Sequence, residues 1–247
     1  MNQWYEDDQF WTTFYDCMFH EERFRDARTE IESLMNLLEV ERGHVLDLAC
    51  GPGRHLEPLA QHFAQVTGLD ASSVLLKKAQ QLCTDRKLDV ELVQADMREY
   101  ERAATFDLIA CLWSSFGYFD TMAEDFEVLE RCCENLKPQG SLIIDIVGKE
   151  QIIRQLEPAH VREFGETRLL LERPCLEDDM SRLSNEWILI DGATAQKRYW
   201  SQNLYTAVEL QGMLGQAGFG AVEVYGGYAG EAYDLEAERL VVVATKH

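Results

Sequence analysis

The chain has 247 residues, 46% of them hydrophobic, and its 44 acidic residues outnumber its 23 basic ones for a net charge of −21. This length suits one large α/β domain, or one domain with an insertion. Such an acidic surface repels phosphate backbones and anionic lipid headgroups, so nucleic-acid and membrane-surface partners are disfavoured. Apolar runs such as SLIIDIV fall far short of the roughly 20 residues that a membrane span needs.

The cysteines and the first residues of the chain indicate the cellular compartment in which the protein is expected. The seven cysteines include no C-x-x-C pair, and no basic segment followed by an apolar one opens the sequence. Reduced thiols and no signal peptide are typical of a cytoplasmic protein. The same spacing predicts no zinc or other metal site.

In chain order, the first twenty residues are rich in aromatic side chains and poor in strand-like alternation, and residues 21–40 place apolar residues at helical spacing. Short apolar runs then alternate with helical segments. We expect strands at 44–49, 65–70, 90–95, 106–112 and 140–147, and helices at about 54–64, 72–85 and 122–136. Continuously apolar strands that alternate with helices predict a mostly parallel sheet covered on both faces.

The pattern changes after Gly148. A short helix is expected at 149–156, and three amphipathic strand-like runs follow, VREFGETRLLLERP, SRLSNEWILID and AQKRYWSQNLY, with a turn at Asp191-Gly192. A helix capped by Thr206 and two closing strands, GAVEVYG and RLVVVATK, end the chain. The sequence thus predicts an antiparallel sheet, residues 149–206, inserted into a domain made of residues 1–148 and 207–247.

The stretch VLDLACGPGRH, residues 45–55, indicates a nucleotide-binding turn after the first strand. Gly51 and Gly53 allow the backbone to approach a ligand. Asp70 ends the second strand, 19 positions after Gly51, where a carboxylate accepts hydrogen bonds from ribose hydroxyls. This arrangement serves dinucleotides and S-adenosylmethionine alike.

Three features favour S-adenosylmethionine over NAD. The third glycine of a dinucleotide turn is replaced by Leu56, and Pro52 stands in its middle. Asp47, inside the first strand, favours a cationic ligand tail such as the ammonium of a methionine moiety. Asp96 and Met97 end the third strand, where an acid can bind the adenine amino group and a flexible apolar side chain can pack on its ring. A pyrophosphate would be repelled by these acids.

With these residues in place, the sequence resembles class I S-adenosylmethionine-dependent methyltransferases. The segments VLDLACGPGRH, VTGLDAS, VQADMRE, FDLIACLWSSFGYF and LKPQGSLIIDIVG look like that family's successive motifs, and YTAVELQGMLGQAGFGAVEVYG like its last helix and strand. The closest resemblance is to bacterial small-molecule methyltransferases with a β-sheet insertion, such as amino-sugar N-methyltransferases. It implies a Rossmann-like, doubly wound, mostly parallel seven-stranded sheet with an antiparallel C-terminal strand.

The resemblance also implies site residues. Those expected to contact the cofactor are Tyr15, Asp47, Gly51, Gly53, Asp70, Ala71, Asp96, Met97 and Trp113. The N-terminal aromatic residues Trp11, Phe14 and Tyr15 are expected to form a lid. Trp113, with Ser114 and Ser115, follows the fourth strand, where such enzymes place residues facing methionine and substrate.

The expected reaction is in-line methyl transfer to a small-molecule acceptor, an amine, a hydroxyl or an activated carbon, with S-adenosylhomocysteine as product. The reaction depends on alignment more than on acid–base chemistry, and candidates for any general base are Asp145, His55 and Tyr118. The insertion is expected to cover the acceptor, with Arg168, Arg198, Tyr199 and Trp200 shaping its pocket, or else to form a homodimer surface. Two other classes stay open: a non-catalytic sensor or partner protein that binds the cofactor, and an NAD-linked enzyme on the same sheet.

Overall fold

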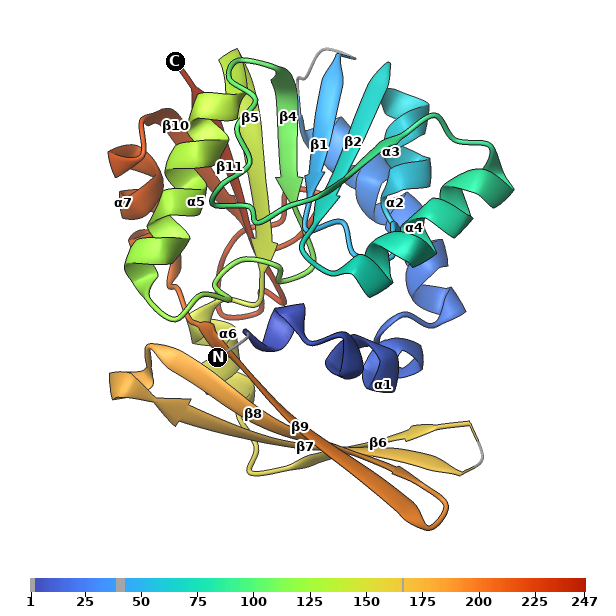
Figure 1. Cartoon of the computed structure of the whole chain (residues 1–247). Coiled ribbons are helices and arrows are strands. Elements are labelled where there is room, and N and C mark those ends of the chain that lie inside the picture. Colours follow the sequence, from blue (N-terminus) through green and yellow to red (C-terminus); the bar gives the residue numbers. More distant parts are fainter. Residues whose placement is uncertain (1–2, 39–42, 166) are drawn as a thin grey trace.

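Two β-sheets organise the computed structural model, which describes residues 3–38, 43–165 and 167–247 (Figure 1). The larger sheet contains β1 (His44–Leu48), β2 (Gln65–Asp70), β3 (Glu91–Gln94), β4 (Phe106–Cys111), β5 (Leu136–Ile146), β10 (Phe219–Tyr225) and β11 (Leu240–Lys246). The smaller sheet contains β6 (His160–Phe164), β7 (Arg168–Glu177), β8 (Arg182–Asp191) and β9 (Thr194–Asn203). The helices are α1 (Asp8–Met18), α2 (Glu21–Leu37), α3 (Leu56–His62), α4 (Ser73–Arg86), α5 (Met122–Asn135), α6 (Lys149–Gln155) and α7 (Ala207–Gln216), with short 3₁₀ turns η1 (Trp4–Glu6) and η2 (Asp178–Met180).

The larger sheet has the strand order β10-β11-β5-β4-β1-β2-β3. Strands β1 to β5 pair in parallel, whereas β11 runs antiparallel to both of its neighbours. This confirms the Rossmann-like seven-stranded sheet with an antiparallel C-terminal strand. The parallel strands point their carboxyl ends toward α1 and the smaller sheet (Figure 1).

Helices cover both faces of the larger sheet, which explains why its strands are continuously apolar. Successive side chains of a strand point to opposite faces, so Val45 joins the core beneath α2, α3 and α4, while Leu46 and Leu48 join the core beneath α1, α5 and α7. The central strands are therefore buried on both sides. Among the described residues, no helix is long and apolar enough to cross a membrane.

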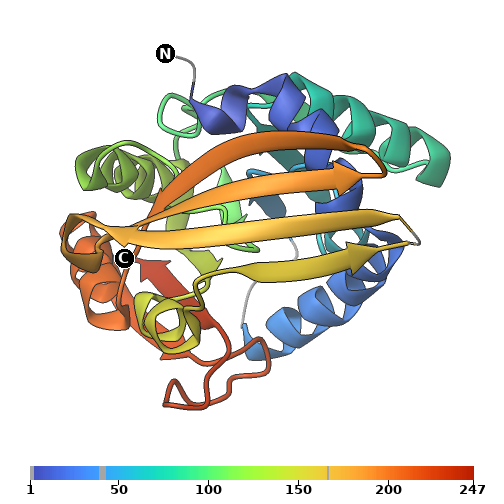
Figure 2. The same cartoon turned by 90° about the horizontal axis from the view of Figure 1, so that it is seen from below.

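The smaller sheet is antiparallel in the order β6-β7-β8-β9 and lies across the carboxyl edge of the larger one (Figure 2). Our prediction of three strands here is wrong, because the first predicted run turns at Gly165, which has a φ of 61°. The predicted turn at Asp191-Gly192 is confirmed, since Asp191 pairs with Thr194 across it. Thr206 caps α7 as expected, accepting a hydrogen bond from the backbone N–H of Glu209.

Other boundaries differ from the expected ones for local reasons. Strand β5 begins at Leu136, not at residue 140, because Leu136 pairs with Phe106 before a register shift, with Gln139 at a φ of 65°. Helix α3 begins only at Leu56, since the glycine turn extends that far. The predicted helix at 21–40 ends at Leu37, and its last two positions, 39 and 40, lie outside the described residues.

One end of the smaller sheet is anchored to the loop after β4. The backbone N–H of Asn203 donates to the carbonyl of Gly117 at 2.6 Å, and a Cβ at Gly117 would stand 2.7 Å from the Asn203 carbonyl oxygen. Asp125 on α5 is fully buried and accepts hydrogen bonds from the Asn203 amide and the Tyr205 hydroxyl, both at 2.6 Å. These close contacts therefore hold the smaller sheet against the carboxyl edge of the larger one.

Candidate active site

A cavity of about 280 Å³ opens between the carboxyl edge of the larger sheet, the N-terminal helices and the smaller sheet. From β2, α4 and the segments next to the strands of the larger sheet, it is lined by Ala49, Cys50, Gly51, Pro52, Arg54, His55, Leu69, Asp70, Ala71, Leu75, Ala95, Asp96, Met97, Leu112, Trp113, Ser114, Ser115, Tyr118, Phe119 and Arg239. From the other two parts it is lined by Trp4, Tyr5, Phe10, Trp11, Met18, Phe19, Trp187, Trp200 and Gln202.

The structure thus brings together most of the predicted site residues but not all. Gly51, Asp70, Ala71, Asp96, Met97, Trp113, His55 and Tyr118 line the cavity, whereas Tyr15, Asp47, Gly53 and Asp145 do not. Tyr15 packs against Phe19 instead, with ring centroids 5.3 Å apart, and carries the Lys78 ammonium over its ring.

The turn after β1 depends on its two glycines in different ways. Gly51 has a φ of 55°, and its backbone N–H donates to Asp70 Oδ2 at 2.8 Å. Gly53 has a φ of 86°, and a Cβ there would stand 2.9 Å from Leu56 Cδ1 and 3.2 Å from Ala79 Cβ. Gly51 therefore shapes the cavity wall, while Gly53 lets α4 pack closely on the turn.

Asp70 is held at the end of β2 by two backbone amides. Gly51 donates to one carboxylate oxygen and Ser72 to the other, each at 2.8 Å. A carboxylate has about four acceptor positions, so two stay available on this cavity-lining residue. Burial raises the pKa of Asp70 to about 6, although these two hydrogen bonds oppose the shift.

Asp47 lies beneath the same turn with one carboxylate oxygen, Oδ2, buried and without a hydrogen-bond partner among the described residues. Desolvation raises the pKa of this group to about 7, against the opposing effect of Arg54. A buried acceptor without a partner is costly, and the raised pKa lowers this cost by favouring the neutral carboxylic acid.

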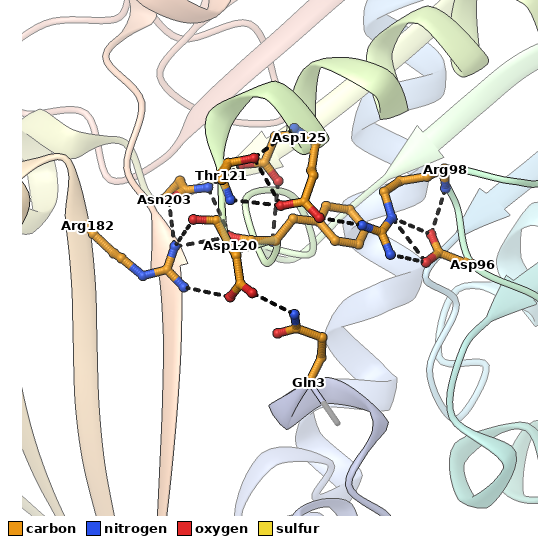
Figure 3. A network of polar contacts seen from close by, with 10 residues as sticks. Gln3, Asp96, Arg98, Asp120, Thr121, Asp125, Arg182 and Asn203 are labelled. Carbon is orange, nitrogen blue, oxygen red and sulfur yellow. Dashed lines mark hydrogen bonds and ion pairs between the residues drawn. The ribbon is translucent and has the colours of Figure 1, made fainter. Parts of the chain in front are cut away.

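Asp96, at the end of β3, is fixed by a residue that the sequence did not single out. Arg98 donates its backbone N–H to Asp96 Oδ1 at 2.8 Å and pairs through its guanidinium with Oδ2 at 2.6 Å (Figure 3). The same guanidinium pairs with Glu124 on α5 at 2.7 Å and lies over the ring of Phe119. Arg98 therefore orients Asp96 and ties β3 to the loop between β4 and α5.

That loop also joins the smaller sheet and the N-terminal segment. Arg182, at the start of β8, donates to the carbonyls of Phe119 and Asp120 at 3.1 Å and to Asn203 Oδ1 at 2.8 Å. Gln3 donates its amide to Asp120 Oδ2 at 2.9 Å. Figure 3 shows these contacts converging on residues 119–121 from separate parts of the chain.

The candidates for a general base have environments that limit this role. His55 lies 3.1 Å from both Glu30 and Arg54, and burial lowers its pKa. Burial raises the pKa of Tyr118, which keeps its phenol protonated at neutral pH. Asp145 is fully buried and accepts hydrogen bonds from the backbone N–H of Trp113 and from Arg239.

Aromatic rings form the wall opposite the larger sheet. Trp4 lies 4.7 Å from Tyr118 and 6.0 Å from Trp200, centroid to centroid, and its indole N–H donates to the Ser201 carbonyl at 2.9 Å. Trp187 packs on Phe10 with centroids 5.8 Å apart. These contacts join η1 and α1 to β8 and β9. Sequence reasoning missed Trp4, Trp187, Gln202 and Arg239, because only the tertiary fold brings them here.

Comparisons with known proteins agree with this geometry. Residues 45–140 match the family model described as a methyltransferase domain. The chain is 28% identical over 210 residues to a cypemycin N-terminal methyltransferase of Streptomyces sp, covering 81% of each chain. It is 31% identical over 134 residues to a dTDP-3-amino-3,6-dideoxy-alpha-D-glucopyranose N,N-dimethyltransferase of Streptomyces fradiae, covering 53% of this chain and 51% of that protein. A solved S-adenosylmethionine-dependent methyltransferase from Clostridium acetobutylicum ATCC 824 has a TM-score of 0.80 at 18% identity, covering 97% of this chain and 98% of that one.

The sheet order, the glycine turn and these matches define a methyltransferase of the class I fold. Residues 45–140 form a methyltransferase domain, which indicates an enzyme with S-adenosylmethionine as its cofactor.

The raised pKa of Asp47 makes a prediction for the free protein. A carboxyl whose pKa rises from 3.8 to about 7 on folding stabilises the folded state at low pH, and this contribution is lost as the pH rises through 7. Asp47→Asn removes the buried charge, so we expect the variant to melt about 2–4 °C above the wild type at pH 8, with the gain absent at pH 4. Thermal melts without cofactor measure this. Glu127→Gln, an exposed acid on α5, is the control, and an Asp47→Asn melting temperature no higher than the wild type's at pH 8 would contradict the prediction.

Proposed function

We propose that this enzyme methylates an amine nitrogen of a small-molecule acceptor. The observation that carries the proposal is the absence of an available general base among the described residues that line the cavity. An amine in its unprotonated form attacks without one, whereas a hydroxyl or a carbon acid needs a base to remove its proton. The names of the two curated relatives, an N-terminal methyltransferase and an N,N-dimethyltransferase, support an amine acceptor.

Each titratable side chain of the cavity is either held by hydrogen bonds and ion pairs or protonated at neutral pH, and a protonated group cannot act as a base. Asp70 and Asp96 are held by backbone amides and by Arg98. Burial raises the pKa values of Tyr5 and Tyr118, and of the Cys50 thiol, so these groups stay protonated. Burial keeps His55 neutral, but its Nε2 lies 3.1 Å from both Arg54 Nε and Glu30 Oε2, so this nitrogen is already occupied.

In this proposal the turn after β1 and the three strand-end acids hold the cofactor. The two free acceptor positions of Asp70, next to Ala71, accept from ribose hydroxyls, Asp96 accepts from the adenine amino group with Met97 on the ring, and Asp47 balances the ammonium. Bound there, the cofactor supplies a methyl group activated on a sulfonium. The chain's own contribution is alignment, with Gly51 and Trp113 at the methionine end and the aromatic wall excluding water.

Asp70 provides a direct test of this placement. Charge-assisted hydrogen bonds contribute about 1.5–3 kcal/mol each, so Asp70→Ala should weaken S-adenosylhomocysteine binding at least about tenfold. Calorimetric titration measures the dissociation constant, with a thermal melt to verify folding. Asp85→Ala, an exposed acid on α4, should leave binding unchanged. If the two variants bind equally well, Asp70 serves the turn and the start of α4 only.

Matched acceptors test the amine proposal. We expect S-adenosylhomocysteine release from primary and secondary amines of a metabolite panel, and background rates from the alcohols of the same carbon skeletons. For an amine substrate, kcat/KM should rise with pH up to the pKa of the acceptor's own amine, because no residue of the enzyme takes its proton. Turnover of an alcohol in preference to its matched amine would refute the proposal.

We also propose that residues 149–206 cover the acceptor. On β9, Trp200 and Gln202 line the cavity, while Ser201 between them and Tyr199 before them do not. Of the residues first expected to shape the acceptor pocket, only Trp200 lines this cavity. Tyr199 is 61% exposed and bonds to Glu186, and Arg168 and Arg198 form ion pairs with Asp16 and Asp7 on and before α1.

Two neighbouring residues on β9 separate this role from a structural one. Trp200→Ala removes an aromatic contact worth about 1 kcal/mol or more, so we expect the KM for the acceptor to rise at least fivefold, with S-adenosylhomocysteine affinity within twofold of the wild type. Tyr199→Ala, on the outer face, should change neither. A loss of cofactor affinity in Trp200→Ala with an unchanged acceptor KM would place the acceptor elsewhere.

The setting of the reaction follows from charge and thiol chemistry. All seven cysteines are free, and six of them are buried, which supports a reducing, cytoplasmic environment. The net charge of −21 makes a nucleic acid an unfavourable acceptor. The alternative role for residues 149–206 is a homodimer surface. The exposed face of the smaller sheet would then form the contact with the second copy.

A further inference from the structure

The loop after β4 contains two consecutive left-handed residues, neither of them glycine. Trp113 has a φ of 59° and Ser114 a φ of 63°. Such conformations are unfavourable for residues that carry a side chain, and they persist only where the surrounding structure enforces them. Both residues line the cavity. Whatever enforces this turn therefore also sets the shape of the cavity wall.

Asp145, near the end of β5, supplies the direct contacts to the turn. Its Oδ2 accepts from the Trp113 backbone N–H at 2.8 Å, and its own carbonyl accepts from the Ser114 backbone N–H at 2.8 Å. The Ser114 hydroxyl in turn accepts from the backbone N–H of Val147 at 3.1 Å. The end of β5 thus holds both residues of the turn by their backbones.

The Asp145 carboxylate is itself held by the far end of the chain. Tyr228 donates its hydroxyl to Oδ2 at 2.5 Å, and Arg239 donates its Nε to Oδ1 at 2.7 Å. Arg239 also donates to the Ser114 hydroxyl at 3.1 Å. Both residues belong to the segment between β10 and β11, which closes on itself through the Arg239 N–H and the Gly226 carbonyl at 3.2 Å.

The indole of Trp113 is held on its other side by cations. The guanidinium groups of Arg54 and Arg23 lie 5.0 and 5.3 Å from its ring centroid, and the ring of Phe19 lies 5.6 Å away. Arg54 is paired with Glu30, so its position is fixed independently of Trp113. The direction of the indole therefore depends on the backbone turn beneath it.

We propose that Asp145, Tyr228 and Arg239 are positioning residues that hold the Trp113-Ser114 turn in its left-handed conformation and so fix the Trp113 indole at the cofactor end of the cavity. Asp145 then acts by accepting hydrogen bonds, with no proton transfer to or from the acceptor. The segment between β10 and β11 becomes part of the cofactor site although only Arg239 reaches the cavity. This inference rests on the cofactor site and not on the identity of the acceptor.

A pair of tyrosines on the same segment tests the proposal. Tyr228→Phe removes the hydroxyl that donates to Asp145. Tyr233→Phe also removes a hydroxyl, but one that contacts Glu150 and Gln151 instead. We expect Tyr228→Phe to weaken S-adenosylhomocysteine binding about tenfold, as for one lost hydrogen bond to a charged group. Tyr233→Phe should bind within twofold of the wild type.

Fluorine NMR of protein labelled with 5-fluorotryptophan reports on the indole itself, and Trp113→Phe identifies its line. Tyr228→Phe should shift or broaden the Trp113 line while the other tryptophan lines stay in place. Arg239→Lys, which keeps the charge but not the two simultaneous contacts with Asp145 and Ser114, should move the same line. If Tyr228→Phe and Arg239→Lys match Tyr233→Phe in both affinity and spectrum, the positioning role is wrong, whatever the outcome of the acceptor screen.

Discussion

Carboxylates buried at one edge of a parallel sheet are the constraint on which this structure depends. Asp47, Asp70 and Asp145 are each at most 8% exposed, and each sits at or near the carboxyl end of its strand. A buried charge requires partners, and the chain meets this need differently at each position. Asp70 accepts hydrogen bonds from two backbone amides. Asp145 accepts them from a backbone amide, a tyrosine hydroxyl and a guanidinium. Asp47 has one oxygen without a hydrogen-bond partner in the described part of the chain. Asp70 and Asp145 are thus fixed by their hydrogen bonds, whereas Asp47 is left with a raised pKa.

The wall opposite these acids comes from parts of the chain that are far apart in sequence. The N-terminal turn and helix, the smaller sheet and the loop after β4 meet through rings and through a few hydrogen bonds. Arg182 and Gln3 both donate hydrogen bonds to residues 119–120 of that loop. Arg98, which follows β3, lies over the ring of Phe119 in the same loop. The loop therefore connects the part of the cavity next to β3 to the smaller sheet. Its own glycine, Gly117, is required by the close approach of Asn203.

Local sequence patterns predicted the features that depend on neighbouring residues. The apolar strands and the glycine turn after β1 follow from short local patterns, and the placement of Asp70 beside Gly51, 19 positions away, follows from the regular strand–helix alternation between them. The cavity wall could not be predicted in this way. Trp187 and Trp200 look like ordinary residues of an amphipathic sheet until the sheet is laid over the cavity, and Arg239 lies between strands with no motif of its own. Tyr15 and Trp11 share one face of a helix, and only the packing of α1 on Phe19 and the smaller sheet decides which of them reaches the cavity.

The smaller sheet is attached unequally at its two ends. Asn203 and Arg182 fix one end through buried or partly buried hydrogen bonds, while the other end meets α1 through Arg168 with Asp16 and Arg198 with Asp7, which are largely solvent-exposed pairs. Exposed pairs are weak and are screened by salt, whereas buried contacts are screened far less. High ionic strength is therefore expected to weaken the two ion pairs to α1 first, while the packing of Trp187 on Phe10 and Phe14 and the hydrogen bonds at Asn203 keep the sheet in place.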